Sequence, residues 1–326
     1  MNKTLPTFLN LLGHQAAGGV TEVCVFKDGD VPTHVGYFDN LEAAVKEIEK
    51  QDGRGNIFVT LDPAKRDLLA RGANRLIEGS FKRKLKRTKN EEILCKSWLF
   101  FDIDAKRPSG ISSTDDELNA AIEVGQHVRE WMLSIGVPAS AIVTAKSGNG
   151  VYVLVRLPDY GITSEQAAII KAFTKYVASL FNTEQVKIDD SVHNAARLCC
   201  ALGTMKVKGE NIAERPHRRS SIGTVGGELF DPENQQGCEP FDLAALAARI
   251  VPKEEPKPAG NAFRSGAPAA NAFDIRQHYH LLSNHKPSSR GYSYFDCPAR
   301  RNSKTPCQRN DWRVRMFLLQ CRHVLG

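Results

Sequence analysis

Two aspartates two positions apart follow a run of large apolar residues, Trp98–Phe101, in the first third of the chain. On a β-strand, side chains two apart point to the same face, so Asp102 and Asp104 are predicted to project side by side. Adjacent carboxylates repel, and burying them without a partner is costly. A divalent cation such as Mg²⁺ or Mn²⁺, which prefers carboxylate oxygens, would remove that cost. A solvated acidic turn at the end of a strand is the competing interpretation.

A metal site for nucleotide chemistry needs a third carboxylate and groups that bind phosphate. Asp189 and Asp190 both offer the carboxylate, although such a pair also caps turns and helices. The turn Ser147-Gly148-Asn149-Gly150 can bring backbone N–H groups and a hydroxyl to an anion, or it is a plain hairpin turn. Side chains that suit a polyphosphate follow at Arg197, Lys206, Lys208, Arg215, His217, Arg218 and Arg219.

A dense basic run, KRKLKRTK at 82–89, precedes the acidic strand. A solvated loop is one interpretation of such a run. Its position before the acidic pair also favours contacts to the phosphates of a nucleic acid. On that interpretation the contact residues are Lys82, Arg83, Lys84 and Lys86.

The elements that would position these residues fall into two groups. The first hundred residues predict strands at 20–26, 34–38 and 56–61 around a helix at 41–51, which indicates a small mixed α/β module.

The second group surrounds the acidic pair. Thr114 and Glu117 fit a capping box, so a helix is predicted from there to about residue 133. The Asn-Gly pair at 149–150 predicts a hairpin that joins strands at 141–145 and 151–157. The remaining predictions are a helix from 163 to about 181, short strands and turns over 186–209, and a helix at 241–250.

Composition restricts the class of protein. The chain has 326 residues, 41% of them hydrophobic and 25% charged, which is ordinary for a globular protein. A net charge of +7 is compatible with a nucleic-acid partner. No apolar run reaches membrane-spanning length, the N-terminal residues lack the pattern of a signal peptide, and the eight cysteines are scattered. These features predict a cytoplasmic protein with reduced thiols and no membrane partner.

Taken in order, these stretches resemble the archaeo-eukaryotic primase superfamily over about residues 20–225. The three motifs that carry the resemblance are Phe101-Asp102-Ile103-Asp104, the turn at 147–150, and the run from Asp189 to Arg197. The later stretches 203–209 and 215–218 are similar to the tail of its primase-polymerase branch, found on plasmids, phages and mobile elements.

The resemblance implies an α+β fold, a two-part catalytic domain with an antiparallel sheet like that of RNA-recognition motifs. The catalytic domain is expected at 1–250, with an N-terminal α/β module at about 1–95 and the sheet module at about 96–225. A linker rich in Pro, Ala, Gly and Lys is expected at 251–272, and a small segment follows at 273–326, which is expected to be an incomplete part of a longer protein.

The activity that the resemblance implies is that of a DNA primase-polymerase, which transfers nucleotides under the direction of a template. Asp102, Asp104 and Asp189 would hold two Mg²⁺ or Mn²⁺ ions, Asp189 being preferred over Asp190 because the family motif places its acid three residues before the valine. Implied partners are a single-stranded DNA template, a primer and NTP or dNTP, with a helicase as a further candidate. The triphosphate would be held by Ser147, Gly148, Gly150, Tyr152, Arg197, Lys206 and Lys208, and nucleic acid by the basic run, Arg215 and Arg218.

The chain departs from the family pattern at Tyr152. The family has a histidine there that contacts the triphosphate, whereas a tyrosine stays neutral at pH 7. Since Val151, Val153 and Val155 suit the core, Tyr152 is expected to face the acidic cluster, and a change to histidine is expected to raise primer synthesis.

Three other functions compete with this interpretation. A catalytically weakened single-stranded-nucleic-acid-binding replication protein of the same fold is favoured by Tyr152 and opposed by the three acids. A metal-dependent nuclease would not explain the glycine turn and the later lysines. A rolling-circle nicking enzyme would need a His-x-His pair beside a nucleophilic tyrosine, and His278-Tyr279-His280 lies in the wrong context.

The C-terminal segment contains a candidate zinc site. Four nitrogen or sulfur ligands are enough for Zn²⁺. The spacing is not that of a Cys-x-x-Cys knuckle, so unpaired thiols are the alternative. The candidate ligands are Cys297, Cys307, Cys321 and His323.

Overall fold

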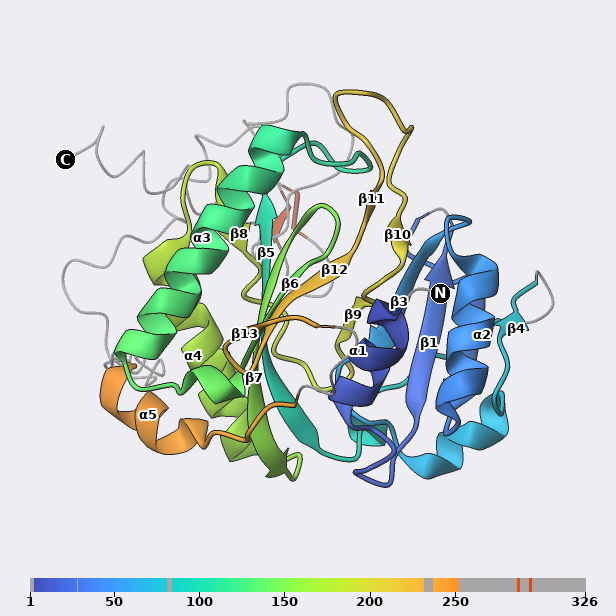
Figure 1. Ribbon diagram of the computed structural model, residues 1–326, viewed down its shortest axis with the longest axis horizontal. Helices are drawn as coiled ribbons and strands as arrows, with labels where there is room; N and C mark the ends of the chain where they lie inside the picture. Colours follow the sequence, from blue (N-terminus) through green and yellow to red (C-terminus); the bar gives the residue numbers. More distant parts are fainter. Residues whose placement is uncertain are drawn as a thin grey trace. The chain divides into compact units, whose positions relative to one another are not determined.

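A βαββαβ arrangement stands at the centre of the computed structural model (Figure 1). Its strands lie in the order β6-β7-β5-β8, and every neighbouring pair is antiparallel. This is the split βαβ arrangement of ferredoxin-like and RNA-recognition-motif sheets, so the expected α+β fold class is confirmed. The elements are β5 (Lys96–Ala105), α3 (Asp115–Ser134), β6 (Ile142–Lys146), β7 (Gly150–Tyr160), α4 (Ser164–Phe181) and β8 (Val186–Ile188), with β12 (Ser221–Val225) and β13 (Glu228–Leu229) added beyond β6.

A second sheet of five strands is built mainly from the N-terminal residues. Its order is β4-β2-β1-β3-β9, and the last strand comes from residues that follow β8 of the first sheet in the chain. The N-terminal part of the fold therefore takes one strand from residues well beyond 95. The elements are α1 (Thr4–Leu12), β1 (Thr21–Phe26), β2 (His34–Phe38), α2 (Leu41–Gln51), β3 (Asn56–Thr60), β4 (Ile77–Glu78) and β9 (Leu198–Cys200).

The structure describes residues 3–27, 29–80, 84–231 and 237–251, together with the backbone of β14 (Lys286–Pro287) and β15 (Ser293–Tyr294). The chain divides into two compact units, 1–253 and 254–326, and β14 pairs with β15 inside the second. Among the described residues, no helix is both long and apolar enough to cross a membrane. Smaller elements of the first unit are η1 (Arg66–Arg71), η2 (Asn90–Glu92), η3 (Ala139–Ala141), β10 (Met205–Lys206), β11 (Arg218–Arg219) and α5 (Leu243–Ile250).

The expected helices start where their capping residues predict. The Thr114 hydroxyl accepts from the backbone N–H of Glu117, whose carboxylate accepts from the N–H of Thr114, so the predicted capping box is present. Asn40 and Thr163 accept in the same way at the starts of α2 and α4. Each such cap stabilises its helix by about 1 kcal/mol.

The first helix was not expected from the sequence, because Pro6 interrupts its apolar run. Pro6 is the third residue of α1, and in the first turn a proline removes an N–H that has no partner within the helix. The helix buries Leu5, Phe8 and Leu12, spaced by three and four residues, and ends at Gly13 with φ 73°.

Strand β5 is buried on both faces, which explains its run of four large apolar residues. Leu99 and Phe101 pack against α3, α4 and α5 in one core. Trp98 and Phe100 face the opposite way, into a core shared with α1 and the second sheet. Full burial of each such side chain contributes about 1.5–3 kcal/mol. Strand β5 therefore contacts the helices on one face and the second sheet with α1 on the other, and it fixes both relative to the C-terminal end of β5.

A buried carboxylate links the two sheets at the opposite end of β5. Asp62, which follows β3, is fully buried and accepts from Lys96 Nζ at 2.5 Å. It also accepts from the backbone N–H groups of Ser97 and Trp98 at 2.8 and 3.1 Å. Because three donors satisfy this carboxylate, its burial fixes where the second sheet meets the first.

Candidate active site

Asp102 and Asp104 lie where the apolar part of β5 ends. They share the face of Trp98 and Phe100, but both are only partly buried. Asp104 is paired with Gly150 of β7. A Cβ at Gly150 would lie 2.1 Å from Asp104 Oδ1 and 2.4 Å from the carbonyl oxygen of the residue before it. A glycine is required at position 150 because the Asp104 carboxylate occupies the place of a side chain.

Asp189 follows β8 and joins this pair. Its N–H donates to the Asp102 carbonyl oxygen at 2.9 Å. Ser191 donates from its hydroxyl and its N–H to Asp189 Oδ1, at 2.6 and 3.0 Å. Arg197 donates from Nη2 to Asp189 Oδ2 at 3.2 Å, and the same nitrogen is 3.7 Å from Asp102 Oδ2. Of the two sequence candidates for a third acid, the structure places Asp189 beside Asp102.

The neighbouring carboxylates Asp104 and Asp189 both act on the pKa of Asp102. Burial and repulsion from Asp104 raise the pKa of Asp102 to about 7, although Arg197 partly offsets the rise. Burial also acts to raise the pKa of Asp189, but the hydrogen bonds from Ser191 and the charge of Arg197 outweigh it and leave that pKa below its ordinary value. Asp102 is therefore the carboxylate that lacks sufficient positive charge nearby.

The glycine turn lies against β10. Gly148 has φ 100°, and a Cβ there would lie 2.6 Å from Lys206 Cβ. The Ser147 hydroxyl accepts from the Gly150 N–H at 3.1 Å, which closes the turn. Lys206 Nζ lies 4.0 Å from the centre of the Phe58 ring. The turn therefore lies against Lys206 at Gly148 and against Asp104 at Gly150.

Asn149 ties the same turn to the start of α3. Its Oδ1 accepts from the N–H of Ser113 at 2.9 Å. Arg218 donates to the Ser113 carbonyl oxygen at 2.8 Å and to Asp115 at 2.6 Å. Three segments that are distant in sequence are therefore fixed to one another beside Asp104. The sequence singled out the turn, but not Asn149 as its connection to α3.

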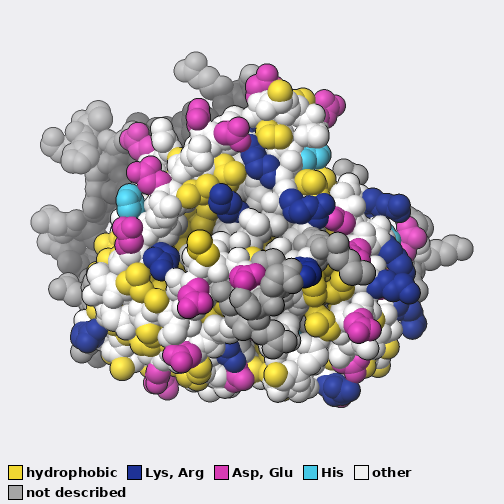
Figure 2. Space-filling model, in the orientation of Figure 1, with side chains coloured by type: hydrophobic (Ala, Val, Ile, Leu, Met, Phe, Trp, Pro, Cys, Tyr) yellow, Lys and Arg dark blue, Asp and Glu magenta, His cyan; other side chains and the backbone are white. Residues whose placement is uncertain are grey.

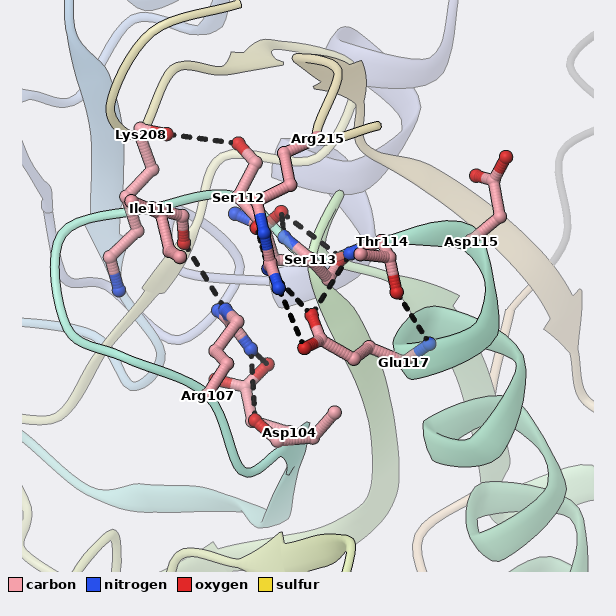
Figure 3. Close-up of polar contacts among 12 residues, drawn as sticks. Asp104, Arg107, Ile111, Ser112, Ser113, Thr114, Asp115, Glu117, Lys208 and Arg215 are labelled. Atoms are coloured by element: carbon pink, nitrogen blue, oxygen red, sulfur yellow. Dashed lines mark hydrogen bonds and ion pairs between the residues drawn. The ribbon is translucent and has the colours of Figure 1, made fainter. Parts of the chain in front are cut away.

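The segment between β10 and β11 is fixed to α3 by a second arginine (Figure 3). Arg215 forms a two-pronged ion pair with Glu117, at 2.8 and 3.0 Å, and also donates to the Ser112 carbonyl oxygen at 2.7 Å. The sequence predicted nucleic-acid contacts for Arg215 and Arg218. The structure engages both guanidinium groups with acids of α3, so their role in DNA binding stays a prediction.

Arg107 is a site residue that the sequence did not single out. Its Nε donates to the Ile111 carbonyl oxygen at 3.2 Å and its Nη1 to the Ala105 carbonyl oxygen at 3.1 Å, while Nη1 is 3.7 Å from Asp104 Oδ1 (Figure 3). Only 7% of its side chain is exposed. Burial and the charge of Arg107 lower the pKa of Lys208, a cation nearby. An arginine three residues after a metal-binding pattern is the signal that could have revealed it.

Tyr152 lies on the expected face of β7, directly opposite Asp102. Its ring packs edge-on against Phe100, with 4.8 Å between ring centres, and its hydroxyl accepts from the Cys200 N–H at 3.3 Å. The side chain is buried in the core between the sheets. The structure therefore gives Tyr152 a packing role between β7 and β9, where the sequence predicted a contact to the triphosphate.

The described part of the basic run, residues 84–89, contacts β1 and β2 of the second sheet, and Lys82 and Arg83 fall outside the described residues. The buried Glu22 carboxylate accepts from the Thr88 N–H at 2.8 Å, and Tyr37 donates to the carbonyl oxygen of Lys86 at 3.3 Å. Lys84 and Lys86 themselves are exposed. In the view of Figure 2, further Lys and Arg side chains gather over the region of β10 and β11.

The donor atoms of the acidic site determine which metal ion it could hold. Within the described part of the chain, no three His, Cys, Asp or Glu side chains are grouped closely enough to hold a metal ion by themselves. The pair Asp102 and Asp104 offers only carboxylate oxygens, and its repulsion is what a divalent cation would relieve. The residues therefore fit Mg²⁺ or Mn²⁺ in their chemistry. The zinc candidates Cys297, Cys307, Cys321 and His323 lie outside the described residues.

No protein-family model and no curated protein matches the chain. Among solved structures it is similar to the AEP domain of the cyanophage S-2L primase-polymerase, with 12% identity over 74% of this chain and 96% of that one, at a TM-score of 0.36. It is also similar to primase RepB′, with 11% identity over 74% of this chain and 60% of that one, at a TM-score of 0.39. A third is the polymerase domain of Mycobacterium tuberculosis ligase D in complex with DNA, with 15% identity over 76% and 86%, at a TM-score of 0.36.

Proposed function

We propose that this chain is a DNA primase-polymerase that performs template-directed nucleotidyl transfer in the replication of a plasmid, phage or other mobile element. The observation that carries the proposal is the position of Asp104 and Asp189, each near Asp102 at the end of the central sheet, beside a glycine turn and Lys206. Acids for a metal and cations for a triphosphate are the two requirements of this chemistry.

The acids would hold two Mg²⁺ or Mn²⁺ ions, which when bound lower the pKa of the primer hydroxyl and neutralise charge on the transferred phosphate. The backbone of β5 and β8 orients Asp102 and Asp189 through the hydrogen bond between them. Lys206 and Lys208 would bind the oxygens of the triphosphate, together with Arg197 and the N–H groups of the turn at 147–150. Gly148 carries no side chain, which lets the turn lie close against Lys206 of β10.

Template binding is assigned to the basic run and to the charged segment near β10 and β11. Lys84 and Lys86 are exposed on a backbone that Glu22 and Tyr37 hold in place, so they are available to phosphates. We retain the proposal that 1–250 forms the catalytic domain, 251–272 a linker and 273–326 a small segment. Zinc in that segment and a helicase partner stay predictions.

The test is nucleotide incorporation on primed and unprimed single-stranded templates, with Mg²⁺ or Mn²⁺ and labelled nucleotides. Asp102→Ala and Asp104→Ala should each abolish extension while DNA binding and folding are retained. Asp116→Ala, in an exposed acid of α3, is the matched control and should extend the primer normally. Extension at the normal rate by the double Asp102 and Asp104 variant would show that the site is elsewhere.

A second function, a replication protein that binds single strands with weakened catalysis, is favoured by one observation. The hydroxyl of Tyr152 is engaged with Cys200 inside the core, so the place of the family histidine supplies no cation to a triphosphate. The same assay separates the two functions. Tight binding of single strands without incorporation on either template would favour the binding protein.

A further inference from the structure

Arg197 occupies a place that its assigned role in nucleotide binding does not explain. Its Nη2 lies between Asp189 Oδ2, at 3.2 Å, and Asp102 Oδ2, at 3.7 Å. These are two of the three carboxylates that would hold metal ions. An arginine cannot be a metal ligand, because its guanidinium keeps its proton and offers donors only. A guanidinium and a divalent cation both carry positive charge, so they cannot share these oxygens closely.

The contacts of Arg197 are also incomplete. Its Nε is buried and has no hydrogen-bond partner among the described residues. A buried donor without an acceptor is costly and rare in stable structures. About a quarter of the side chain is nevertheless exposed, so the guanidinium has a route towards solvent. The unpaired Nε and the partial exposure indicate that the Arg197 side chain can move away from the carboxylates.

Arg107 on the other side of the acids shows what a fixed arginine looks like here. Backbone carbonyl oxygens of Ala105 and Ile111 accept from it, and its distance to Asp104 Oδ1 is 3.7 Å (Figure 3). Its hydrogen bonds do not depend on the carboxylate. Arg197, in contrast, is held at Nη2 by the carboxylates themselves, so a cation that binds them removes its partner.

We propose that Arg197 is a positioning residue that acts as the counter-cation of the metal-free site, and that divalent cations displace its guanidinium from Asp102 and Asp189 towards the triphosphate. This inference rests on the proposed function, because it takes these acids as the metal ligands. It makes metal binding and the release of Arg197 a single event. Arg197 then competes with metal ions in the free protein and becomes available to the nucleotide only after they bind.

The test measures Mn²⁺ affinity directly, by the loss of the free-ion signal in electron paramagnetic resonance, without nucleotide or DNA. Arg197→Gln should bind Mn²⁺ about tenfold more tightly than the wild type, because a competing charge is removed from the ligands. Lys206→Gln is the matched control. It removes one positive charge that acts on Asp102 from outside the pair, and should tighten binding by about threefold or less. Arg197→Lys, which keeps the charge but not the fork, should fall between the wild type and Arg197→Gln.

A purely structural role for Arg197 predicts the opposite result, since loosening the site would weaken metal binding. Arg197→Gln binding Mn²⁺ no more tightly than the wild type, or no more tightly than Lys206→Gln, would overturn the inference and leave the proposed function standing. Absence of Mn²⁺ binding in both the wild type and Arg197→Gln would overturn the proposed function and the inference with it.

A second measurement uses the wild-type protein, so that the proposal can be tested even where Arg197→Gln does not fold. The Nε–Hε resonance of Arg197, assigned by its loss in Arg197→Lys, should shift during titration with diamagnetic Mg²⁺. The same titration of Asp102→Asn should leave the resonance in place. A resonance that does not move over the Mg²⁺ range that saturates the wild-type protein would contradict the displacement.

Discussion

Gly150→Ala is the substitution whose effect on the site can be worked out most fully from the structure. Its Cβ would lie 2.1 Å from Asp104 Oδ1, whereas ordinary contacts begin at 3.4 Å, so the carboxylate must move by about 1.3 Å (3.4 minus 2.1). The carbonyl oxygen of Ile103, at 2.4 Å, belongs to the backbone and cannot rotate away, so β5 and β7 must also separate by about 1 Å. The substitution therefore displaces Asp104 without changing its charge.

The expected result is a loss of function larger than the loss of stability. Overpacking of this kind lowers the free energy of unfolding by about 1–3 kcal/mol. A displacement of about 1 Å in a reacting site lowers a rate by about 100-fold. Primer extension should therefore fall about 100-fold, while denaturant unfolding shows a folded protein. Gly161→Ala, at a position with no other atom within 4 Å of the new Cβ, is the matched control and should leave both unchanged.

Extension by Gly150→Ala at the wild-type rate would refute this reasoning, because Asp104 could then not lie against Gly150. If Gly150→Ala is unfolded under conditions where Gly161→Ala is folded, the expected loss of about 1–3 kcal/mol in the free energy of unfolding is wrong. The displacement of Asp104 can also be detected by Mn²⁺ affinity. This affinity should fall in Gly150→Ala and stay unchanged in the control Gly161→Ala.

Three further predictions concern residues around the site. Burial raises the pKa of Glu22 above its ordinary value of 4.5, so the folded protein holds the carboxyl proton of Glu22 more tightly than the unfolded chain does. The free energy of unfolding of the wild type should therefore fall as the pH rises from 4.5 through the raised pKa of the folded state. Urea titrations at a series of pH values should show this fall in the wild type and not in Glu22→Gln. Tyr152→Phe should lower the free energy of unfolding by about 1–3 kcal/mol, because it leaves the buried Cys200 N–H without an acceptor. Tyr152→His should not raise primer synthesis. A rise in primer synthesis would show that the side chain at position 152 turns towards the acids. Neutralising Lys84 and Lys86 should flatten the log–log salt dependence of single-strand binding by about 0.7 per lost contact, and an unchanged slope would identify a solvated loop.

Local patterns in the sequence were sufficient to predict most of the central sheet and its helices. The capping box at Thr114 and the Asn-Gly turn are signals within a few residues, and both produced the expected elements. The alternation of β7 placed Val153 in one core and Tyr152 on the face of Asp102. Periodicity shows which side chains share a face of a strand, but not how deeply that face is buried. It therefore could not show that Tyr152 is buried between two sheets.

The parts that were missed depend on contacts between distant segments. Strand β9 joins the second sheet across a long separation in sequence, and no pattern in three residues specifies that partner. The ion pairs of Arg215 and Arg218 with α3 have the same origin, since the sequence shows the charges but not their partners. The position of Arg107, three residues after Asp104, could have drawn attention to it, but the sequence does not show which backbone carbonyl groups hold it.

The central claim is that Asp189 completes an acidic site for nucleotidyl transfer with Asp102 and Asp104, and two neighbouring residues test it directly. The measurement is the rate of nucleotide incorporation on a primed single-stranded template by Asp189→Asn and Asp190→Asn. Asp189 is fixed beside Asp102 by a backbone hydrogen bond of 2.9 Å, whereas the carbonyl oxygen of Asp190 accepts from His193. We predict that Asp189→Asn abolishes incorporation and that Asp190→Asn retains it. Retained incorporation in Asp189→Asn would contradict the assigned site.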